Sequence, residues 1–432
     1  MSFVSRTTCR LCSGPLVTVL ELEPTPPANA LLHGGTCIDQ VNRYEADGKT
    51  ERRVPSPPQD GYADDDEPEE CYPLTLAQCS ACDHVQLREV VDPKLLFSDY
   101  AYQSGTSPVF RAHLEKLARQ LSATLFPDDL VVEIGSNDGT LLSYFQQPIR
   151  RLGIDPGSQA PAAKAKGVST IVDFFGLETA RTVRSSVGRA RLILALNCLA
   201  HIDDLDDIAD GCRDLLADDG QLVMEVAYLP DMLRDGTFDL VYHEHVSFHH
   251  LAPLVPFFAT RGLCLYDAER IDTQGGSIRC YVSKRDKPQT DRLRGLLGRE
   301  RELVTPEALD RFKARIATTK TELTELLGAI KAKGHRIAAF GCPAKATTMF
   351  HHFGIGRETI DVIYEENLAK VGKFSPGKHI RIAGVDEFRK DPPAYVLLAA
   401  WNFSSDVRSR HEWFTDGGGQ WILPMPKVEV VG

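Results

Sequence analysis

The segment 130–142 constrains the fold of this chain more than any other. Its residues Val131-Val132-Glu133-Ile134 predict a buried strand, and Gly135-Ser136-Asn137-Asp138-Gly139 predicts a turn into a helix that starts near Thr140. We expect Gly135 to let the backbone turn sharply, and Gly139 to let a ligand lie against bare main chain. Exposed amides at the helix start favour polar or anionic ligand groups. The segment therefore predicts a ligand site at a strand end, although an ordinary strand-to-helix turn has the same pattern.

The next predicted strands end in polar residues at matching positions. Leu152-Gly153-Ile154-Asp155 ends in an acid, and in doubly wound sheets an acid at about this distance accepts hydrogen bonds from ribose hydroxyls. Asp173 and Phe174 suit an adenine edge and face, and the apolar strand 192–196 ends at Asn197. Together these features resemble the motifs of class I S-adenosylmethionine (SAM)-dependent methyltransferases, which implies an α/β domain of that fold at 96–300. The residues expected to bind SAM are Glu133, Gly135, Asn137, Asp138, Gly139, Asp155, Asp173, Phe174 and Asn197.

Length and charge narrow the class of protein further. The chain has 432 residues and a formal net charge of −11, which predicts two or three domains and argues against a general nucleic-acid binder. Its N-terminus has no secretory pattern, and no uncharged apolar run is long enough to span a membrane. We therefore expect a soluble cytoplasmic enzyme, either a monomer or a small homo-oligomer.

Four cysteines form two pairs at the spacing of zinc knuckles. Cys9 and Cys12 lie near the N-terminus, and Cys79 and Cys82 follow after a long gap. Two such turns can bring four thiolates into the tetrahedron of a closed structural zinc site. Because a closed site leaves no position for water, the zinc ion is expected to be architectural. Free thiols are the alternative interpretation.

The segment 33–70 between these pairs is rich in proline and acidic residues. It contains Pro55-Ser56-Pro57-Pro58 and the run Asp64-Asp65-Asp66-Glu67-Pro68-Glu69-Glu70, which offer little apolar surface to bury. We therefore expect a mobile surface loop, inserted into a zinc-binding domain of residues 1–95. Cys37 and Cys71 at its borders are competing candidates for the metal, but neither has a partner at knuckle spacing.

A cluster of titratable side chains follows the expected cofactor region. Tyr242-His243-Glu244-His245 are four consecutive polar residues, and His201 lies just beyond Asn197, on the rim where such sheets bind ligands. A histidine accepts a proton near neutral pH, a carboxylate orients its ring, and a tyrosine donates to a developing oxyanion. The cluster thus suits proton removal beside a carbonyl, which methylation of carbon requires. A metal site and a hydrogen-bonded core cluster are the alternatives; neighbouring residues on a strand point to opposite faces, which disfavours the metal.

Motifs along most of the chain match those of one enzyme family. They are Cys9-x-x-Cys12, Pro27-Ala28-Asn29, Tyr72-Pro73-Leu74, Cys79-x-x-Cys82, Val85-Gln86-Leu87, Phe97-Ser98-Asp99-Tyr100-Ala101-Tyr102-Gln103-Ser104, Glu133-Ile134-Gly135-Ser136-Asn137-Asp138-Gly139, Tyr242-His243-Glu244-His245 and Gly275-Gly276-Ser277-Ile278-Arg279. On these motifs the chain resembles the sugar C-methyltransferases that act on nucleotide-linked deoxysugars. The resemblance implies that a zinc-binding domain and a C-terminal α/β domain flank the methyltransferase core and enclose the sugar nucleotide.

The resemblance also implies roles for single residues. His245 would be the general base that removes a proton beside a 4-keto group, and Tyr242 and Glu244 would hold the keto oxygen and orient this base. His201 would face the same oxygen, while Tyr100 or Tyr102 would close over the sugar. The residues expected to contact the rest of the substrate are Tyr102, Ser104, Arg279, Lys345, Lys370 and Lys373. This chemistry requires no metal ion.

The C-terminal residues 301–432 predict a second doubly wound unit. Segments 336–340, 362–364 and 395–400 read as strands that end in polar residues, and 305–327 has helical spacing and would link the two units. Alone, this unit could be a nucleotide pocket or a packing scaffold. The family's Asp-x-Asn-Pro is replaced here by Glu365-Glu366-Asn367-Leu368, which leaves the contacts at this point open.

These patterns predict a SAM-dependent C-methyltransferase that acts on an NDP-4-keto-deoxysugar at C3. Methylation at C5, or at a sugar nitrogen or oxygen, would keep the same fold and motifs. A non-catalytic scaffold that keeps the SAM fold to bind a partner is a hypothesis of another class. A dehydrogenase is disfavoured, because neither α/β unit has the Gly-x-Gly-x-x-Gly spacing.

Overall fold

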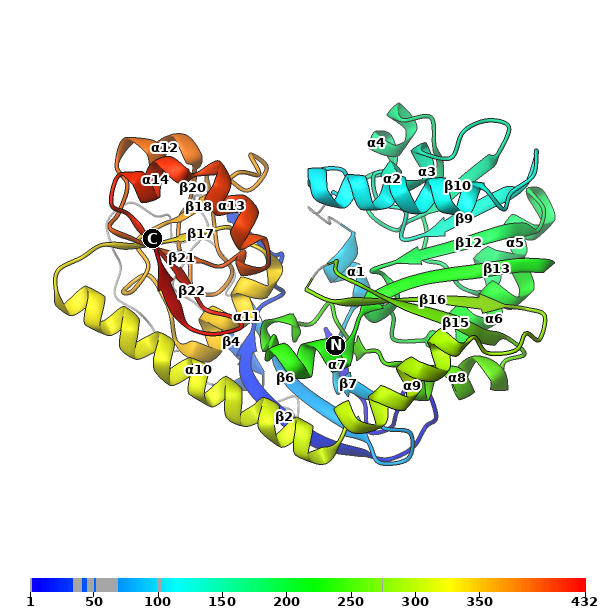
Figure 1. Ribbon diagram of the computed structural model, residues 1–432, viewed down its shortest axis with the longest axis horizontal. Coiled ribbons are helices and arrows are strands. Elements are labelled where there is room, and N and C mark those ends of the chain that lie inside the picture. The colour runs from blue at the N-terminus through cyan, green and yellow to red at the C-terminus, as the bar shows by residue number, and fades with distance from the viewer. Residues whose placement is uncertain (1, 34–40, 45–49, 52–68, 99–102, 274) are drawn as a thin grey trace.

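The computed structural model describes residues 2–33, 41–44, 50–51, 69–98, 103–273 and 275–432 (Figure 1). The N-terminal strands lie at the base of the molecule, between a central α/β unit on one side and a C-terminal α/β unit on the other. The two α/β units therefore face each other across the N-terminal part.

A seven-stranded sheet forms the central unit, in the order β11-β10-β9-β12-β13-β16-β15. Its strands are β9 (Leu130–Ile134), β10 (Arg150–Ile154), β11 (Ser169–Ile171), β12 (Ala190–Leu196), β13 (Leu216–Ala227), β15 (Cys264–Ile271) and β16 (Ser277–Ser283). The predicted strands at 131–134, 152–154 and 192–196 are confirmed. Strands β9 to β13 pair in parallel, whereas β16 is antiparallel to both of its neighbours. The strand order reverses between β9 and β12, which is where doubly wound sheets bind ligands.

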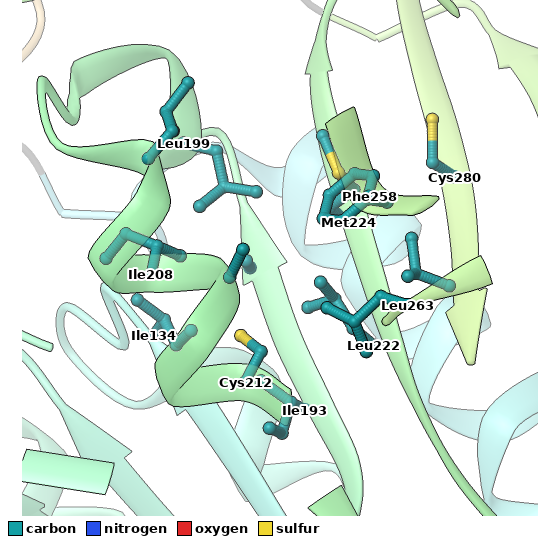
Figure 2. Packing of buried hydrophobic residues seen from close by; sticks show 14 of the residues in the cluster. Ile134, Ile193, Leu199, Ile208, Cys212, Leu222, Met224, Phe258, Leu263 and Cys280 are labelled. Atoms are coloured by element: carbon teal, nitrogen blue, oxygen red, sulfur yellow. The ribbon is translucent and has the colours of Figure 1, made fainter. Parts of the chain in front are cut away.

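Helices cover both faces of this sheet. They are α2 (Pro108–Ser122), α3 (Thr140–Ser143), α4 (Ala160–Ala165), α5 (Leu177–Ser186), α6 (Leu205–Leu215), α8 (Leu251–Thr260) and α9 (Asp291–Leu303). Successive strand residues point to opposite faces, so Val132 joins the core beneath α6 and α8 while Val131 packs against α2. Figure 2 shows Ile208 and Cys212 of α6 near Ile134 and Ile193 of the sheet. Each buried aliphatic side chain contributes about 1.5–3 kcal/mol, which keeps the ligand-binding edge rigid.

The N-terminal part is a sheet that includes a strand from the central unit. β2 (Leu16–Thr25) pairs with β6 (Glu69–Cys79), which pairs with β7 (Val85–Leu87), and β7 pairs with β14 (Ser247–Phe248). A two-stranded pair, β1 (Phe3–Ser5) and β8 (Glu89–Val91), leads into α1 (Pro93–Phe97). The segment just after the predicted base His245 is thus built into the N-terminal sheet.

Parts of the expected loop 33–70 are strands, so that expectation is wrong for them. β4 (Val41–Tyr44) pairs in parallel with β6, and β5 (Thr50–Glu51) pairs with β4. Strand pairing uses backbone groups, which need no apolar side chain. Glu69, at the start of β6, accepts a hydrogen bond from the Gly377 backbone N–H at 2.9 Å and lies 2.5 Å from His379 Nε2. The remainder of the segment, with Pro55–Pro58 and 64–68 of the acidic run, lies outside the described residues.

The C-terminal unit has a six-stranded sheet in the order β20-β18-β17-β21-β22-β23. Its strands are β17 (Ile337–Phe340), β18 (Ile363–Glu365), β20 (Ile382–Gly384), β21 (Tyr395–Leu398), β22 (Gln420–Leu423) and β23 (Glu429–Val431), and its helices include α10 (Pro306–Ala332), α11 (Ala344–Phe353), α12 (Val385–Lys390), α13 (Ser404–Arg410) and α14 (Glu412–Asp416). The predicted linking helix is confirmed as α10. Thr305 caps this helix, because its hydroxyl accepts a hydrogen bond from the Ala308 N–H. The strand order reverses between β17 and β21.

The parts of the molecule pack against one another through shared clusters of buried hydrophobic residues. Leu22, Leu74 and Leu76 of the N-terminal strands belong to the same buried cluster as residues of α10, α11 and β17, including Phe312 and Ile337. Three short helices lie in the region between the units: η1 (Leu199–His201), α7 (Leu229–Asp235) and η2 (Phe238–Leu240). β3 (Leu32–His33) pairs with β19 (Lys373–Phe374). A further short helix, η3 (Trp401–Phe403), follows β21. Within the described ranges, no helix is long and apolar enough to cross a membrane.

Candidate active site and metal centre

The four paired cysteines converge on one point of the N-terminal part. All four sulfur atoms lie within 4.8 Å of one another, with Cys9 Sγ 3.6 Å from Cys82 Sγ and Cys12 Sγ 3.5 Å from Cys79 Sγ. Four thiolates about 2.3 Å from a tetrahedral zinc ion lie roughly 3.8 Å apart, so these spacings fit zinc. Among the described residues, this is the one group of His, Cys, Asp or Glu side chains placed to hold a metal ion.

The turns of the two knuckles are built alike. Ser13 and Asp83 each adopt a left-handed conformation just after the second cysteine of a pair, with φ of 59° and 63°. The backbone N–H groups of Leu11 and Ala81 each point at the sulfur of the first cysteine, at 3.4 Å. Such N–H donors stabilise thiolates, as the closed site requires. Cys71 is buried within β6, outside the cluster, and Cys37 lies outside the described residues.

A cavity of about 1490 Å³ opens between the three parts of the molecule. Residues from the carboxyl ends of β9, β10, β12 and β17 line it, together with residues of α1. Both sheets therefore direct their switch points at the same space. Typical small-molecule sites measure roughly 300–1,000 Å³, so this cavity has room for two ligands side by side.

Two carboxylates define the end of the cavity at the central sheet. Asp155 accepts hydrogen bonds from the backbone N–H groups of Asn137 and Gly157, both at 2.8 Å. Glu133 is buried, and its Oε2 has no hydrogen-bond partner among the described residues. Burial raises the pKa of Glu133, and the nearby Asp155 raises it further. This pair suits a ligand with hydroxyl and ammonium donors and a positive charge, which SAM provides, and disfavours a diphosphate.

Most of the predicted SAM residues line this end of the cavity, but some do not. Lining residues are Glu133, Gly135, Asn137, Asp155, Phe174 and Asn197. Asp138 instead pairs with Lys166 at 2.7 Å and accepts from the Thr140 N–H. Asp173 is exposed and accepts from the Phe174 N–H. Both carboxylates thus have partners within the protein, and their roles in SAM binding stay predictions.

Gly139 packs closely against a neighbouring helix. Its φ is +71°, and a Cβ atom there would lie 2.9 Å from Ala163 Cβ, in the packing of α4. This packing already requires a glycine, and the contact of Gly139 with a ligand stays a prediction. Gly135 (φ +67°) has a similar contact, because a Cβ atom there would lie 2.9 Å from Cys198 Cβ.

The imidazole of His245 is held in a defined tautomer at the cavity wall. Its Nδ1 lies 2.8 Å from the Leu240 carbonyl, which can only accept, so Nδ1 carries the proton. The other nitrogen, Nε2, is left as an acceptor 2.9 Å from the Tyr242 hydroxyl. Burial lowers the pKa of His245 to about 4, so the ring is neutral at physiological pH and ready to accept a proton.

One further ring stacks on His245, and a second stacks on the first. The His201 ring lies 5.2 Å from the His245 ring between centroids, and Phe97 at the end of α1 stacks on His201 at 5.5 Å. Burial holds the pKa of His201 well below its usual range. Phe97 and His201 both line the cavity. Sequence reasoning gave Phe97 no role, although it begins one of the matching motifs.

Glu244 and His243 do not line the cavity. Glu244 is buried and accepts a hydrogen bond from Asn29 Nδ2 at 2.7 Å, while His243 Nε2 lies 3.1 Å from the Pro73 carbonyl. Neither residue is among those that line the cavity, and the contact of Glu244 with the substrate oxygen stays a prediction. Asn29 does line it, and sequence reasoning missed this residue although it lies in the matching motif Pro27-Ala28-Asn29.

The predicted substrate residues divide in the same way. Lys345 and Lys370 line the far end of the cavity, whereas Lys373 lies in β19 and does not. Arg279 is buried against Glu225 at 2.5 Å and Glu269 at 3.0 Å, so its charge is already paired within the protein; its contact with the substrate stays a prediction. Ser104 lines the cofactor end, and its N–H donates to Asn137 Oδ1 at 3.0 Å. Tyr100 and Tyr102 lie outside the described residues.

Lys345 occupies an unusual environment. Its Nζ lies 3.8 Å from the ring centroid of Trp401 and donates to Asn402 Oδ1 at 2.6 Å. Burial lowers the pKa of Lys345 to about 8, against the opposing effect of Asp239. Lys370 donates to the Cys342 carbonyl at 2.7 Å. Two ammonium groups at this end favour an anionic ligand, opposite in charge to the ligand favoured at the cofactor end.

The doubly wound sheet, its acid-lined switch point and the four-cysteine cluster define a class I SAM-dependent methyltransferase with a zinc-knuckle domain. Comparisons with known proteins agree. Family models described as "Putative zinc binding domain", "Methyltransferase domain" and "C-methyltransferase C-terminal domain" match residues 55–97, 108–267 and 272–426. The chain is 31% identical over 379 residues to the C-methyltransferase NovU of Streptomyces niveus, covering 86% of this chain and 90% of NovU.

The chain therefore belongs to the family of SAM-dependent C-methyltransferases that includes NovU, and its four paired cysteines are placed to hold a zinc ion. Solved structures similar to it include a magnesium protoporphyrin IX methyltransferase of Synechocystis PCC 6803 with bound SAH, at 13% identity and a TM-score of 0.33 over 43% of this chain and 90% of that one. The N-methyltransferase NodS of Bradyrhizobium japonicum WM9 is similar at 15% identity and a TM-score of 0.31, over 41% of this chain and 97% of that one.

Proposed function

We propose that the protein methylates C3 of an NDP-4-keto-deoxysugar, after removing the C3 proton with His245. The observation that carries this proposal is the fixed tautomer of His245, a residue that lines a cavity shared by the two α/β units. A ketone acidifies the hydrogens on the carbons beside it, and a neutral imidazole at the cavity wall is a suitable base.

At the cofactor end, Asp155 would accept hydrogen bonds from the ribose hydroxyls of SAM, and Glu133 would supply a partner for another donor. Bound there, SAM supplies an electrophilic methyl group. The cation of SAM and the two carboxylates would stabilise one another, which would favour the ionised form of Glu133. Phe174 adds an apolar surface at the same end.

At the reacting carbon, His245 Nε2 would take the proton, and the electron pair of the C–H bond would move into an enolate. The Tyr242 hydroxyl, 2.9 Å from Nε2, is placed to turn and donate to the enolate oxygen. The stacked ring of His201 would form part of the wall around the same space. Glu244 would act through Asn29, whose amide it orients at the cavity wall. Tyr100 or Tyr102 would close over the sugar.

At the far end, Lys345 and Lys370 would bind the nucleotide diphosphate. A nearby diphosphate would raise the pKa of Lys345 from about 8 and so favour its charged form. Under this proposal, residues 1–95 carry the zinc site, 96–300 bind the donor and hold the base, and 301–432 bind the nucleotide.

The proposal is tested by incubating the enzyme with SAM that carries a ¹³C-labelled methyl group and a panel of NDP-4-keto-deoxysugars. The expected result is transfer to one of them, with the label bonded to C3 in the carbon NMR spectrum. C5 also adjoins the ketone, so label at C5 would contradict methylation at C3 and would assign the reaction to C5. Label on oxygen or nitrogen would contradict the base role of His245, and transfer to no sugar in the panel would overturn the proposed substrate class.

A further inference from the structure

Arg10 lies inside the first zinc knuckle, between Cys9 and Cys12, and its side chain is fully buried. Its Nη1 donates to the carbonyls of Leu87 at 2.7 Å and Val246 at 2.8 Å. Its Nε donates to Asp203 Oδ1 at 2.7 Å. A side chain between two metal ligands thus extends away from the metal and joins separate segments of the molecule.

The acceptors of Arg10 lie next to the two stacked histidines. Val246 directly follows His245, and Asp203 comes two residues after His201. The Val246 carbonyl also accepts from the Leu87 N–H at 3.0 Å, where the N-terminal sheet meets the strand β14. The guanidinium therefore ties the segment that carries His245 to the segment that carries His201.

The position of Arg10 itself is set by the knuckle. Its backbone N–H donates to Gln86 Oε1 at 2.9 Å, and its Cα lies between two cysteines of the metal cluster. The planar guanidinium presents donors in fixed directions, so it can hold three acceptors at once, which a lysine ammonium on a flexible stem does less well. A displacement of about 1 Å in a catalytic group can lower a rate roughly 100-fold, so a fixed spacing between the histidines matters.

We propose that Arg10 is a positioning residue, through which the zinc knuckle sets the relative positions of His201 and His245. The zinc knuckle would then influence proton transfer through the contacts of Arg10, without touching the substrate. The catalytic part of this inference rests on the proposed function of His245, whereas its geometric part does not.

The test compares Arg10→Lys with Arg6→Lys in the zinc-loaded full-length protein. Arg6 is a matched control, because it also pairs with Asp203, at 2.5 Å. Unlike Arg10, it is partly exposed and makes no hydrogen bond to Val246 within the described part of the chain. For Arg10→Lys we expect full zinc content, SAM affinity within about twofold of wild type, and a kcat lowered about 10- to 100-fold with little change in KM. For Arg6→Lys we expect a kcat within about threefold of wild type.

A second readout follows the histidines directly. In protein with ¹³C-labelled histidine, Arg10→Lys should raise the pKa of His245 toward its ordinary value, because a loosened ring admits water, and Arg6→Lys should not. Unchanged kcat and unchanged titration in zinc-loaded Arg10→Lys would overturn the inference, as would equal effects in both variants. Should Arg10→Lys not fold, Asp203→Asn replaces it, with a lowered kcat and shifted His201 titration as support and wild-type values as contradiction.

The two proposals fail in distinguishable ways. If wild-type protein methylates no sugar, the proposed function fails. The titration of the two histidines needs no acceptor substrate, so a shift in Arg10→Lys that is absent from Arg6→Lys would still support the positioning role.

Discussion

The ring of His245 lies 5.2 Å from the ring of His201, and the two planes are inclined by 21°. Burial lowers the pKa of both imidazoles, and each would repel a charge on the other. At this distance the two rings can hold one proton far more readily than two. Under the proposed function, His245 is therefore a neutral base, and His201 is a neighbour that limits its charge, at the wall of the cavity where the methyl donor would bind.

The activity should depend on pH in a way that follows from this pair. Because the folded-state pKa of His245 lies near 4, below the ordinary 6.5, the base is already unprotonated at pH 6. We expect kcat/KM to stay level from pH 6 to pH 8 and to fall as the pH drops toward 4. Initial rates measured after brief exposure to each pH, with zinc content checked, provide the measurement. A fall centred near pH 6.5 or above would contradict the assigned base.

Stability should also depend on pH, through His243. Burial lowers its pKa to about 4, so between pH 6.5 and 4 the unfolded chain binds a proton there that the folded chain does not. The free energy of unfolding should therefore decrease as the pH falls through this range, by up to roughly 1.4 kcal/mol per pH unit for this group. His243→Gln, which keeps a donor for the Pro73 carbonyl, should show a shallower decrease in urea unfolding. An equal slope in both proteins would count against this contribution.

Asp155→Asn should weaken SAM binding. The change removes the charge that would accept both ribose hydroxyls, and charge-assisted hydrogen bonds contribute about 1.5–3 kcal/mol, so we expect the Kd to rise by roughly 10- to 150-fold. Asp173→Asn is the matched control, since this exposed acid is not among the residues that line the cavity. Calorimetric titration with SAM measures both. A comparable loss in the two variants would show that the cofactor end is wrongly assigned.

Cys79→Ser should release zinc and unfold the N-terminal sheet, because structural zinc contributes on the order of 10 kcal/mol to folding in small zinc domains. Cys71→Ser removes another buried thiol of the same strand, outside the metal cluster, and should keep its zinc. Elemental analysis and thermal unfolding distinguish the two. Full zinc content in Cys79→Ser would exclude the four-cysteine site.

Lys345→Met should raise the KM for the nucleotide sugar by at least about tenfold, because a buried ammonium at the far end of the cavity would be lost. Lys373→Met should change the KM less than twofold, since Lys373 is not among the lining residues. Initial-rate kinetics at saturating SAM measure both. Equal KM values for Lys345→Met and wild type would remove Lys345 from the substrate site.

Local sequence patterns predicted the parts of the site that depend on strand ends. Glu133, Asp155 and Asn197 line the cavity because they end parallel strands beside a switch point, which a strand pattern reveals. Patterns did not show what Asp138 and Gly139 contact. Asp138 pairs with Lys166 and Gly139 packs against α4, and the sequence of the turn itself reveals neither contact. Spacing alone predicted the cysteine cluster.

Contacts between distant segments were beyond prediction from one sequence. Glu244 meets Asn29 across 215 positions, and Arg10 meets Val246 across 236. The non-ligand positions of a zinc knuckle carry no pattern that distinguishes a buried arginine from an exposed one. The strand β4 was missed because its pairing with β6 uses backbone groups within a segment of strongly polar composition.

The most direct test of the account is the exchange of the C3 hydrogen of the acceptor sugar with solvent deuterium, followed by proton NMR in wild type and His245→Asn. With S-adenosylhomocysteine bound in place of SAM, the wild-type enzyme should exchange this hydrogen without methyl transfer. His245→Asn should bind SAM as wild type does and exchange at least about 100-fold more slowly. Exchange at the wild-type rate in His245→Asn would contradict the claim that His245 is the base.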